Sequence, residues 1–196
     1  MNSVQIKEVR HMNTVVTSRE AILAESRRLV MEKGISAINM RTVAAACNVA
    51  VGSIYNYFPS KADLISATVE DVWIDIFHMS GEAEEFKHFT DCLAWMFERI
   101  QTGCIKYPGF FTLHSVSFAV DDKAKGRQMM ESYFSHMKQN LLHVLACDTA
   151  VRDGAFHDTF TPAQFVDMIF TLATSMLLEG QESCEPLMEM VKRCIY

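Results

Sequence analysis

The chain has 196 residues, of which 49% are apolar and 21% charged, and this composition excludes a disordered protein. Its net charge of −6 is unevenly divided. Residues 1–61 hold eight Lys and Arg against four Asp and Glu, a charge of +4, and residues 62–196 hold ten against twenty, a charge of −10. A basic head on an acidic body turns the head toward a polyanion and keeps the body away from it.

Neither a membrane span nor a secretion signal is indicated. The longest charge-free apolar stretch of the C-terminal half, Met168 to Leu178, is too short to cross a bilayer. The first 13 residues carry charges but no apolar core like that of a signal peptide. The six cysteines include no Cys-x-x-Cys pair, so free thiols in a reducing compartment are expected. We therefore expect a cytoplasmic protein without membrane contact.

The first predicted helix follows Thr17 and Glu20, which have the spacing of a capping box. Its apolar stripe consists of Ile22, Leu29 and Val30. Gly34 stands where the residue after a helix takes left-handed backbone geometry, so we expect the helix to end there.

Two shorter helices are predicted next, over Arg41 to Cys47 and Val51 to Phe58. Between them lies Asn48, the residue type best able after glycine to adopt a positive φ in a tight turn. Three short helices, the last two joined by a tight turn, are typical of a helix-turn-helix.

Pro59 blocks continuation of the third helix, and Ser60 with Asp63 predicts a new capping box. The helix that follows is expected to end near Gly81 and carries an apolar face of Ile65, Val69, Val72 and Ile76. Another is expected from about Glu84 to just before Pro108, with an in-phase face of Phe86, Phe89, Leu93, Phe97 and Ile100.

The second half predicts further helices. A short apolar helix is expected over Phe110 to Phe118, and Asp121 with Asp122 introduces a long one bearing Met130, Phe134, Met137, Leu141 and Leu145. Residues 147–160 read as a loop containing Gly154. Thr161, Pro162 and Gln164 start a helix that runs to about Glu179, and the last begins near Pro186. The expectation is an all-α protein of about nine helices.

The segment from Ile38 to Leu64 has the chemistry of a recognition unit. Small residues at positions 44–46 allow close helix packing, and Gly52 allows a backbone to approach. One short helix then presents the hydroxyls and amide of Ser53, Tyr55, Asn56 and Tyr57, which suit phosphate oxygens or base edges. Lys61 lies in the first turn of the next helix, where its ammonium and the unpaired backbone N–H groups favour a phosphate.

This segment resembles the helix-turn-helix of the TetR family of transcriptional regulators, over about Thr17 to Ile65. The resemblance is carried by Ile22, Gly34, Val43, Ala44, Val49, Gly52, the Tyr55-x-Tyr57-Phe58 run, Ser60, Lys61 and Leu64. It implies a DNA-binding domain at residues 1–60 and a helical effector-binding and dimerisation domain at 61–196. It further implies the following DNA-facing residues: Arg41, Thr42, Val51, Gly52, Ser53, Tyr55, Asn56, Tyr57 and Lys61.

Two positions depart from the family pattern. Ala50 stands where a serine usually caps the recognition helix, so that helix end loses about 1 kcal/mol of side-chain capping. Val51 stands where polar or basic residues are common, which favours apolar contact with a thymine methyl group. Tyr55 and Tyr57 have an alternative role as half-buried aromatics. Lys7, Arg10, His11 and Arg19 fit either a minor-groove arm or a solvated tail.

The family resemblance also implies an effector pocket among the middle helices and a homodimer built by the last two. The expected ligand-binding residues are Phe77, Trp95, Phe110, Phe111, His114, Phe118, Tyr133 and Met137, each with ordinary core as its alternative. The expected function is a dimeric repressor that binds a palindromic double-stranded DNA operator and is released by a small apolar organic ligand.

Two other functions stay open. A redox- or metal-responsive regulator would sense through Cys92, Cys104 or His88, since His88 and Cys92 are four residues apart on one expected helix. The other is a small-molecule binding protein with a vestigial head. No nucleophile motif, Gly-rich phosphate loop or His-Glu-x-x-His occurs, so we expect no enzyme, no catalytic residue, no cofactor and no bound metal.

Overall fold

The computed structural model describes residues 17–78, 86–111 and 123–196, and in these ranges the protein is all-helical, as predicted. A single bridge between His157 and Phe160 is the only β-type pairing there. The elements are α1 (Arg19–Lys33), the 3-10 helix η1 (Ile35–Ala37), α2 (Met40–Ala46), α3 (Val51–Tyr55), α4 (Lys61–His78), α5 (Phe89–Lys106), α7 (Lys123–Cys147), α8 (Pro162–Leu178) and α9 (Glu185–Ile195).

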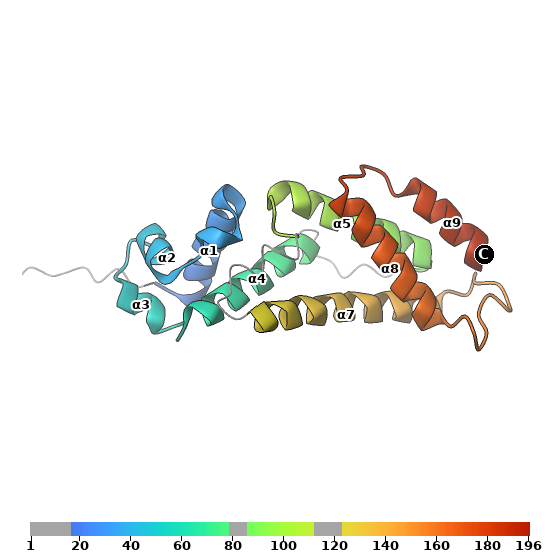
Figure 1. Cartoon of the computed structure of the whole chain (residues 1–196), viewed down its shortest axis with the longest axis horizontal. Helices are drawn as coiled ribbons and strands as arrows, with labels where there is room; N and C mark the ends of the chain where they lie inside the picture. Colours follow the sequence, from blue (N-terminus) through green and yellow to red (C-terminus); the bar gives the residue numbers. More distant parts are fainter. Residues whose placement is uncertain (1–16, 79–85, 112–122) are drawn as a thin grey trace, which may run out of the picture.

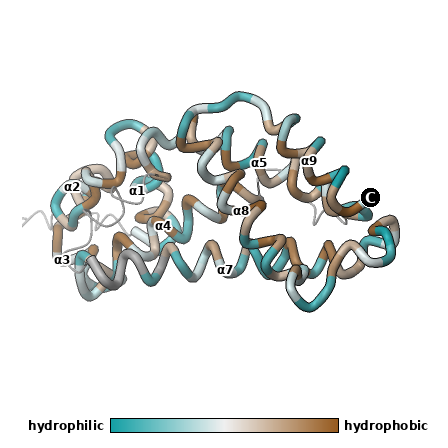
Figure 2. The backbone as a smooth tube through the Cα atoms, turned by 45° about the vertical axis from the view of Figure 1, so that its right-hand side comes forward, coloured by the Kyte–Doolittle hydropathy of each residue, from teal (hydrophilic) through white to brown (hydrophobic). Residues whose placement is uncertain are grey.

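The molecule is elongated, with α1 to α3 at one end and the C-terminus at the other (Figure 1). We call α1 to α3 the head and α4 to α9 the body. Helix α4 leads from the head into the body, where it packs on α5, while α7 runs beside α5 and α8. Apolar and hydrophilic segments alternate along α4 and α7, as expected of helices with one buried face (Figure 2). No helix in the described ranges is both long and apolar enough to cross a membrane.

The starts of α1 and α8 show one wrong and one confirmed prediction. Ser18 caps α1, its hydroxyl accepting a hydrogen bond from the backbone N–H of Ala21 at 3.1 Å. The predicted capping box of Thr17 and Glu20 is therefore wrong by one residue. The backbone carbonyl of Thr17 instead accepts a hydrogen bond from the Tyr57 hydroxyl. Thr161 does form the predicted capping box on α8, with Pro162 in the first turn.

Helices α5 and α3 have other bounds than expected. α5 begins at Phe89 rather than near Glu84, because a carboxylate distant in sequence, Asp148, accepts the backbone N–H of Phe89 at 2.8 Å. Phe86 thus precedes the helix. α3 ends at Tyr55 instead of Phe58. Of the helix predicted over 110–118, residues 110 and 111 lie in a turn and the rest lie outside the described residues, as do the two aspartates expected to start α7.

One continuous apolar core runs from the head into the body. It includes Ile22, Val43 and Ile54 of the head, Leu64, Trp73 and Ile76 of α4, and Leu93, Leu141, Phe170 and Val191 further along the body. Gly103 of α5 lets α5 approach α4, because a Cβ there would lie 3.0 Å from the Ile76 side chain. Since each buried aliphatic side chain contributes about 1.5–3 kcal/mol, head and body stabilise each other through α4.

Asp148 fastens the far end of the body. Its buried carboxylate accepts hydrogen bonds from the Tyr196 hydroxyl and from the backbone N–H groups of Phe89 and Ala150, and its other neighbour is His88 at 3.2 Å. Burial opposes its ionisation, but these hydrogen bonds outweigh burial and lower the pKa of Asp148. The end of α7, the start of α5 and the last residue of the chain are thereby held together.

Asp75 joins three helices where the head meets the body. Its carboxylate accepts hydrogen bonds from the Lys106 ammonium and the Tyr107 hydroxyl, both at 2.6 Å, and lies 3.8 Å from the guanidinium of Arg27 in α1. Arg27 also pairs with Asp71 at 2.9 Å. Burial opposes ionisation of Asp75, yet the hydrogen bonds and the positive charges of Lys106 and Arg27 prevail and lower its pKa.

Replacing Asp75 by Asn should lower the free energy of unfolding by about 2 kcal/mol, because hydrogen bonds to a charged group are lost. The folded-state pKa of Asp75 is lowered, so its contribution is present above the ordinary value of 3.8 and is lost as the pH falls through the lower folded value. Urea unfolding at pH 7 and at pH 3 measures both effects. Asp167→Asn, in an exposed pair with Lys138, is the matched control and should cost below about 0.5 kcal/mol. Equal losses in the two variants would contradict the prediction.

Candidate nucleic-acid interface and effector site

The turn between α2 and α3 is fixed by the backbone. Asn48 has a φ of 52°, confirming the positive φ predicted there. The N–H of Asn48 donates to the carbonyl of Ala45 at 3.2 Å, and that of Val49 to the carbonyl of Ala44 at 3.0 Å. Ala44 and Ile54 are buried between the two helices, so α3 is held rigidly against α2. This is the geometry of a helix-turn-helix.

Asn39 positions the first two predicted DNA-facing residues, and sequence reasoning did not identify it. Its side-chain oxygen accepts hydrogen bonds from the backbone N–H groups of Arg41 and Thr42, which caps α2. Its amide nitrogen donates to the Thr42 hydroxyl at 2.7 Å, leaving Arg41 exposed in the first turn. An Asn directly before a short helix is a capping signal that the sequence did contain.

Helix α3 turns Ile54 into the core and most of its other residues outward. Tyr55 is 51% exposed and Val51 36% exposed, and Gly52 and Asn56 are also exposed, while Ser53 is half-buried. No atom lies within 4 Å of the Cβ that a larger residue would have at Gly52, so that side of α3 is open to a partner. Ala50 provides no side-chain cap, as the sequence predicts.

Tyr57 and Phe58 tie α3 to the start of α1. The Tyr57 hydroxyl donates to the backbone carbonyl of Thr17 at 2.6 Å, although the residue is 40% exposed. Phe58 is buried, with the guanidinium of Arg19 lying 5.5 Å from its ring centroid. Of the two tyrosines, Tyr57 therefore has a structural role in the head, and Tyr55 is the more exposed.

Lys61 begins α4 directly after this surface and is half-buried. The predicted cap at Ser60 is confirmed, because the Ser60 hydroxyl accepts the backbone N–H of Asp63 at 3.2 Å and donates to the Asp63 carboxylate at 2.7 Å. Elsewhere in the head, Arg28 pairs with Glu25 and Glu32. Arg28 is therefore engaged within the head by two carboxylates.

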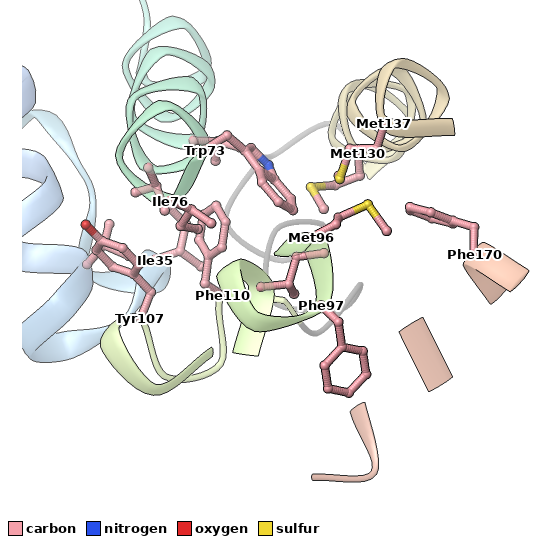
Figure 3. Close-up of a cluster of buried hydrophobic side chains, with 14 of the residues drawn as sticks. Ile35, Trp73, Ile76, Met96, Phe97, Tyr107, Phe110, Met130, Met137 and Phe170 are labelled. Atoms are coloured by element: carbon pink, nitrogen blue, oxygen red, sulfur yellow. The ribbon is translucent and has the colours of Figure 1, made fainter. Parts of the chain in front are cut away.

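Five of the eight predicted ligand-binding residues lie around one aromatic cluster in the body. Phe77, Phe110, Phe111 and Tyr133 all contact Trp73, at ring-centroid distances of 5.2–5.8 Å, and Trp95 lies 5.7 Å from Phe77. Met137 is buried in α7 and, in Figure 3, lies beyond Met130 on the far side of Trp73 from Ile76. His114 and Phe118 lie outside the described residues.

Trp73 is the centre of this cluster, and sequence reasoning missed it. It falls on the buried stripe of α4, one residue after Val72, where a tryptophan is indistinguishable from ordinary core. The available signal was its spacing of four residues from Phe77, which places both rings on one side of a helix.

The residues considered for redox or metal sensing, His88, Cys92 and Cys104, lie in or at the start of α5 and take part in its capping and packing. His88 is the N-cap of α5 and contacts Asp148, and Cys92 is buried. Burial raises the pKa of Cys92 to about 11 and also raises that of Cys104, which suppresses the reactive thiolate. In the described part of the chain, no group of three or more His, Cys, Asp or Glu side chains has the geometry to hold a metal ion.

Sequence comparison matches most of the head and the first turns of α4. The family model described as "Bacterial regulatory proteins, tetR family" matches residues 22–68. Over 47 residues, 24% of this chain, the sequence is 45% identical to the HTH-type transcriptional repressor KstR of Rhodococcus jostii, covering 22% of that protein. It is 43% identical to KstR of Mycolicibacterium smegmatis over the same length, covering 23% of it. The match thus spans about a fifth of these relatives.

Structural comparison extends over most of the chain. The crystal structure of Escherichia coli NemR in its reduced form is similar with a TM-score of 0.59 and 18% identity, covering 91% of this chain and 97% of that one. The multidrug binding protein EbrR, complexed with imidazole, gives a TM-score of 0.55 and 19% identity, covering 98% of each chain. At identities this low, the structural similarity shows a shared fold and no more.

Replacing Ala50 by Ser should stabilise the protein by about 1 kcal/mol, since the serine hydroxyl can accept an N–H in the first turn of α3, which has no side-chain cap. Urea unfolding measures the change. Ala45→Ser, at an exposed position inside α2, is the matched control and should give no gain. A destabilised Ala50→Ser variant would show that the α3 start does not accept a cap.

Proposed function

This chain is a member of the tetR family of bacterial regulatory proteins through its N-terminal helices, and from that premise we propose a function for the whole protein. It is a cytoplasmic, dimeric repressor that binds a palindromic DNA operator through α2 and α3 and leaves the operator when a small organic ligand binds the body. Residues 1–60 form the DNA-binding domain and 61–196 the effector-binding and dimerisation domain.

The observation that carries this proposal is the outward face of α3. A short helix, locked by a buried Ile54 and a backbone-fixed turn, presents Tyr55, Asn56 and Val51 together. A rigid helix with hydroxyl, amide and apolar groups on one face suits the major groove, where each base pair has a distinct pattern. Arg41 and Lys61 lie at the starts of the flanking helices and supply phosphate contacts.

The dimer is supported by apolar residues left exposed on α8. Met168 and Leu172 lie four residues apart and are 53% and 43% exposed, and Leu178, nearer the helix end, is 48% exposed. Met190 of α9 is 39% exposed. Large apolar side chains gathered on one helix favour burial against a partner, and a two-fold dimer places two heads on a palindromic site.

Helix α4 is the proposed route from ligand to DNA. It carries Trp73 and Phe77 of the aromatic cluster, and it is tied to α1 through the Arg27 pairs with Asp71 and Asp75. A ligand that shifts α4 would therefore move α1 and, with it, α3. The two heads must match about one turn of DNA, so a small displacement of each weakens operator binding.

The ligand-responsive function is preferred over the redox- or metal-responsive one. Burial keeps the thiols of Cys92 and Cys104 protonated, and His88 is engaged with Asp148. A vestigial head is disfavoured because the exposed face of α3 keeps Tyr55 and Asn56 outward.

Footprinting on the DNA that flanks this protein's own gene tests the function. The expected result is a protected palindrome whose half-sites lie about one helical turn, or roughly 10 base pairs, apart. Protection without two-fold symmetry, or none on any specific sequence, would overturn it.

Replacing Lys61 by Ala should weaken binding to all DNA sequences and reduce the slope of log affinity against log salt by about one unit, because one phosphate contact is lost. Fluorescence anisotropy at several salt concentrations measures the slope. Lys192→Ala is the control, since α9 lies at the opposite end of the molecule from α3 (Figure 1). An unchanged slope in Lys61→Ala would count against a phosphate contact.

Replacing Met168 and Leu172 together by Glu should produce monomers, because two carboxylates on the proposed interface would lose solvation on burial. Sedimentation velocity measures the mass. Ile105→Glu is the matched control, as Ile105 of α5 is 78% exposed and lies outside the proposed interface. A double variant that sediments as a dimer would place the interface on other helices.

A further inference from the structure

Both tryptophans of the chain lie in the aromatic cluster of the body. The Trp73 ring is stacked with that of Phe77, at a centroid distance of 5.8 Å and an interplanar angle of 11°, and with that of Tyr133, at 5.7 Å and 27°. Phe110, Phe111 and Phe134 meet it edge-on. Figure 3 shows this ring extending from α4 toward Met96, Met130 and Met137. The surroundings of Trp73 are therefore aromatic rings and thioethers.

Both indole N–H groups are buried without an acceptor. Within the described residues only three buried side-chain polar atoms are unpartnered, and two of them are Nε1 of Trp73 and Nε1 of Trp95. A buried indole N–H usually has a partner, and leaving it without one is destabilising. Trp73 is 3% exposed, so its indole N–H is shielded from bulk water. A bound molecule with a hydrogen-bond acceptor would satisfy one of these two donors.

The hydrogen-bonding groups around the cluster favour an acceptor over a cation. The Arg99 guanidinium already lies 5.8 Å from the ring centroid of Trp95. Burial, reinforced by the negative charge of Glu70, raises the pKa of Tyr133 to about 12, so its hydroxyl keeps its proton. An ammonium ion has no acceptor atom, so it cannot satisfy either indole N–H.

Phe77 marks the place that a ligand ring would take. Its ring lies nearly parallel to Trp73 and is 5.7 Å from Trp95, which puts it between the two indoles. It is half-buried, so it can leave that place at a smaller cost than a fully buried ring. A planar ring in the same place, tilted away from the parallel arrangement of Phe77, would keep contact with the Trp73 ring and bring its acceptor into the plane of an indole N–H.

We infer that this cluster binds a planar aromatic molecule carrying a hydrogen-bond acceptor such as a carbonyl, which takes the position of Phe77 and accepts the indole N–H of Trp73. Treating that molecule as the effector rests on the proposed function. The inference deepens it by naming the ligand class and Trp73 as the specificity-determining residue.

Three probes of similar shape separate the alternatives by isothermal titration calorimetry: 2-acetylnaphthalene, 2-ethylnaphthalene, which lacks the acceptor, and protonated 2-(aminomethyl)naphthalene. The intact protein should bind the acetyl compound about tenfold or more tightly than the ethyl compound, since one buried donor is satisfied, and should bind the cation weakest. Equal affinities for the acetyl and ethyl compounds would overturn the inference, as would tightest binding of the cation.

Trp73→Phe keeps an aromatic ring but removes the donor, so the acetyl-to-ethyl affinity ratio should fall to about one. Trp95→Phe is the matched variant, and a ratio lost only there would assign the hydrogen bond to Trp95 instead and overturn the role of Trp73. Phe77→Ala should tighten binding of the acetyl compound, because the competing ring is gone. Weaker binding to Phe77→Ala would contradict displacement.

A measurement on the unmodified protein guards against a misfolded variant. Labelling with 15N-tryptophan gives two indole N–H resonances, and one should move downfield with 2-acetylnaphthalene but not with 2-ethylnaphthalene. Two unmoved resonances would overturn the hydrogen bond. Operator affinity is measured separately with and without the probe. Probe binding that leaves operator affinity unchanged would overturn the effector role alone, whereas failure of the footprint would overturn the DNA-binding function and leave this site standing.

Discussion

The ionised carboxylate of Asp75 is the interaction on which the joint between head and body depends. It is held by Lys106 and Tyr107 of the α5 end and lies near Arg27 of α1, so one half-buried charge links three helices. A charge that is partly removed from water depends on its partners for compensation. The relative position of α1, α4 and α5 is therefore restricted, and a change in one helix must be accommodated by the others.

Helix α4 lies at the centre of that joint and also carries Trp73. The same helix thus contacts the head through charged groups on one side and the aromatic cluster through Trp73 and Phe77 on another. The apolar core is continuous from head to body, so the aromatic cluster and the head belong to one packed interior. This arrangement gives a physical basis for coupling, since densely packed interiors transmit displacement rather than absorbing it.

The cluster around Trp73 combines good apolar packing with incomplete hydrogen bonding. Stacked and edge-on rings stabilise it, while the two unpartnered indole N–H groups cost free energy. Elsewhere in the body, buried polar groups have hydrogen-bond partners, as the Asp148 carboxylate does. The contrast indicates that the cluster is not optimised for stability alone, which is common where a protein binds a ligand.

The sequence by itself determined the helical class, the helix-turn-helix with its positive φ at Asn48, and the cap at Thr161, because these depend on residues close together in the chain. Only the tertiary structure decided the start of α5, where Asp148 supplies a partner from 59 residues away. It alone showed that the Tyr57 hydroxyl is bonded to Thr17 and that Trp73, not one of the predicted residues, is central to the cluster. Local patterns encode periodicity and capping, whereas which donors find acceptors is settled only when distant segments meet.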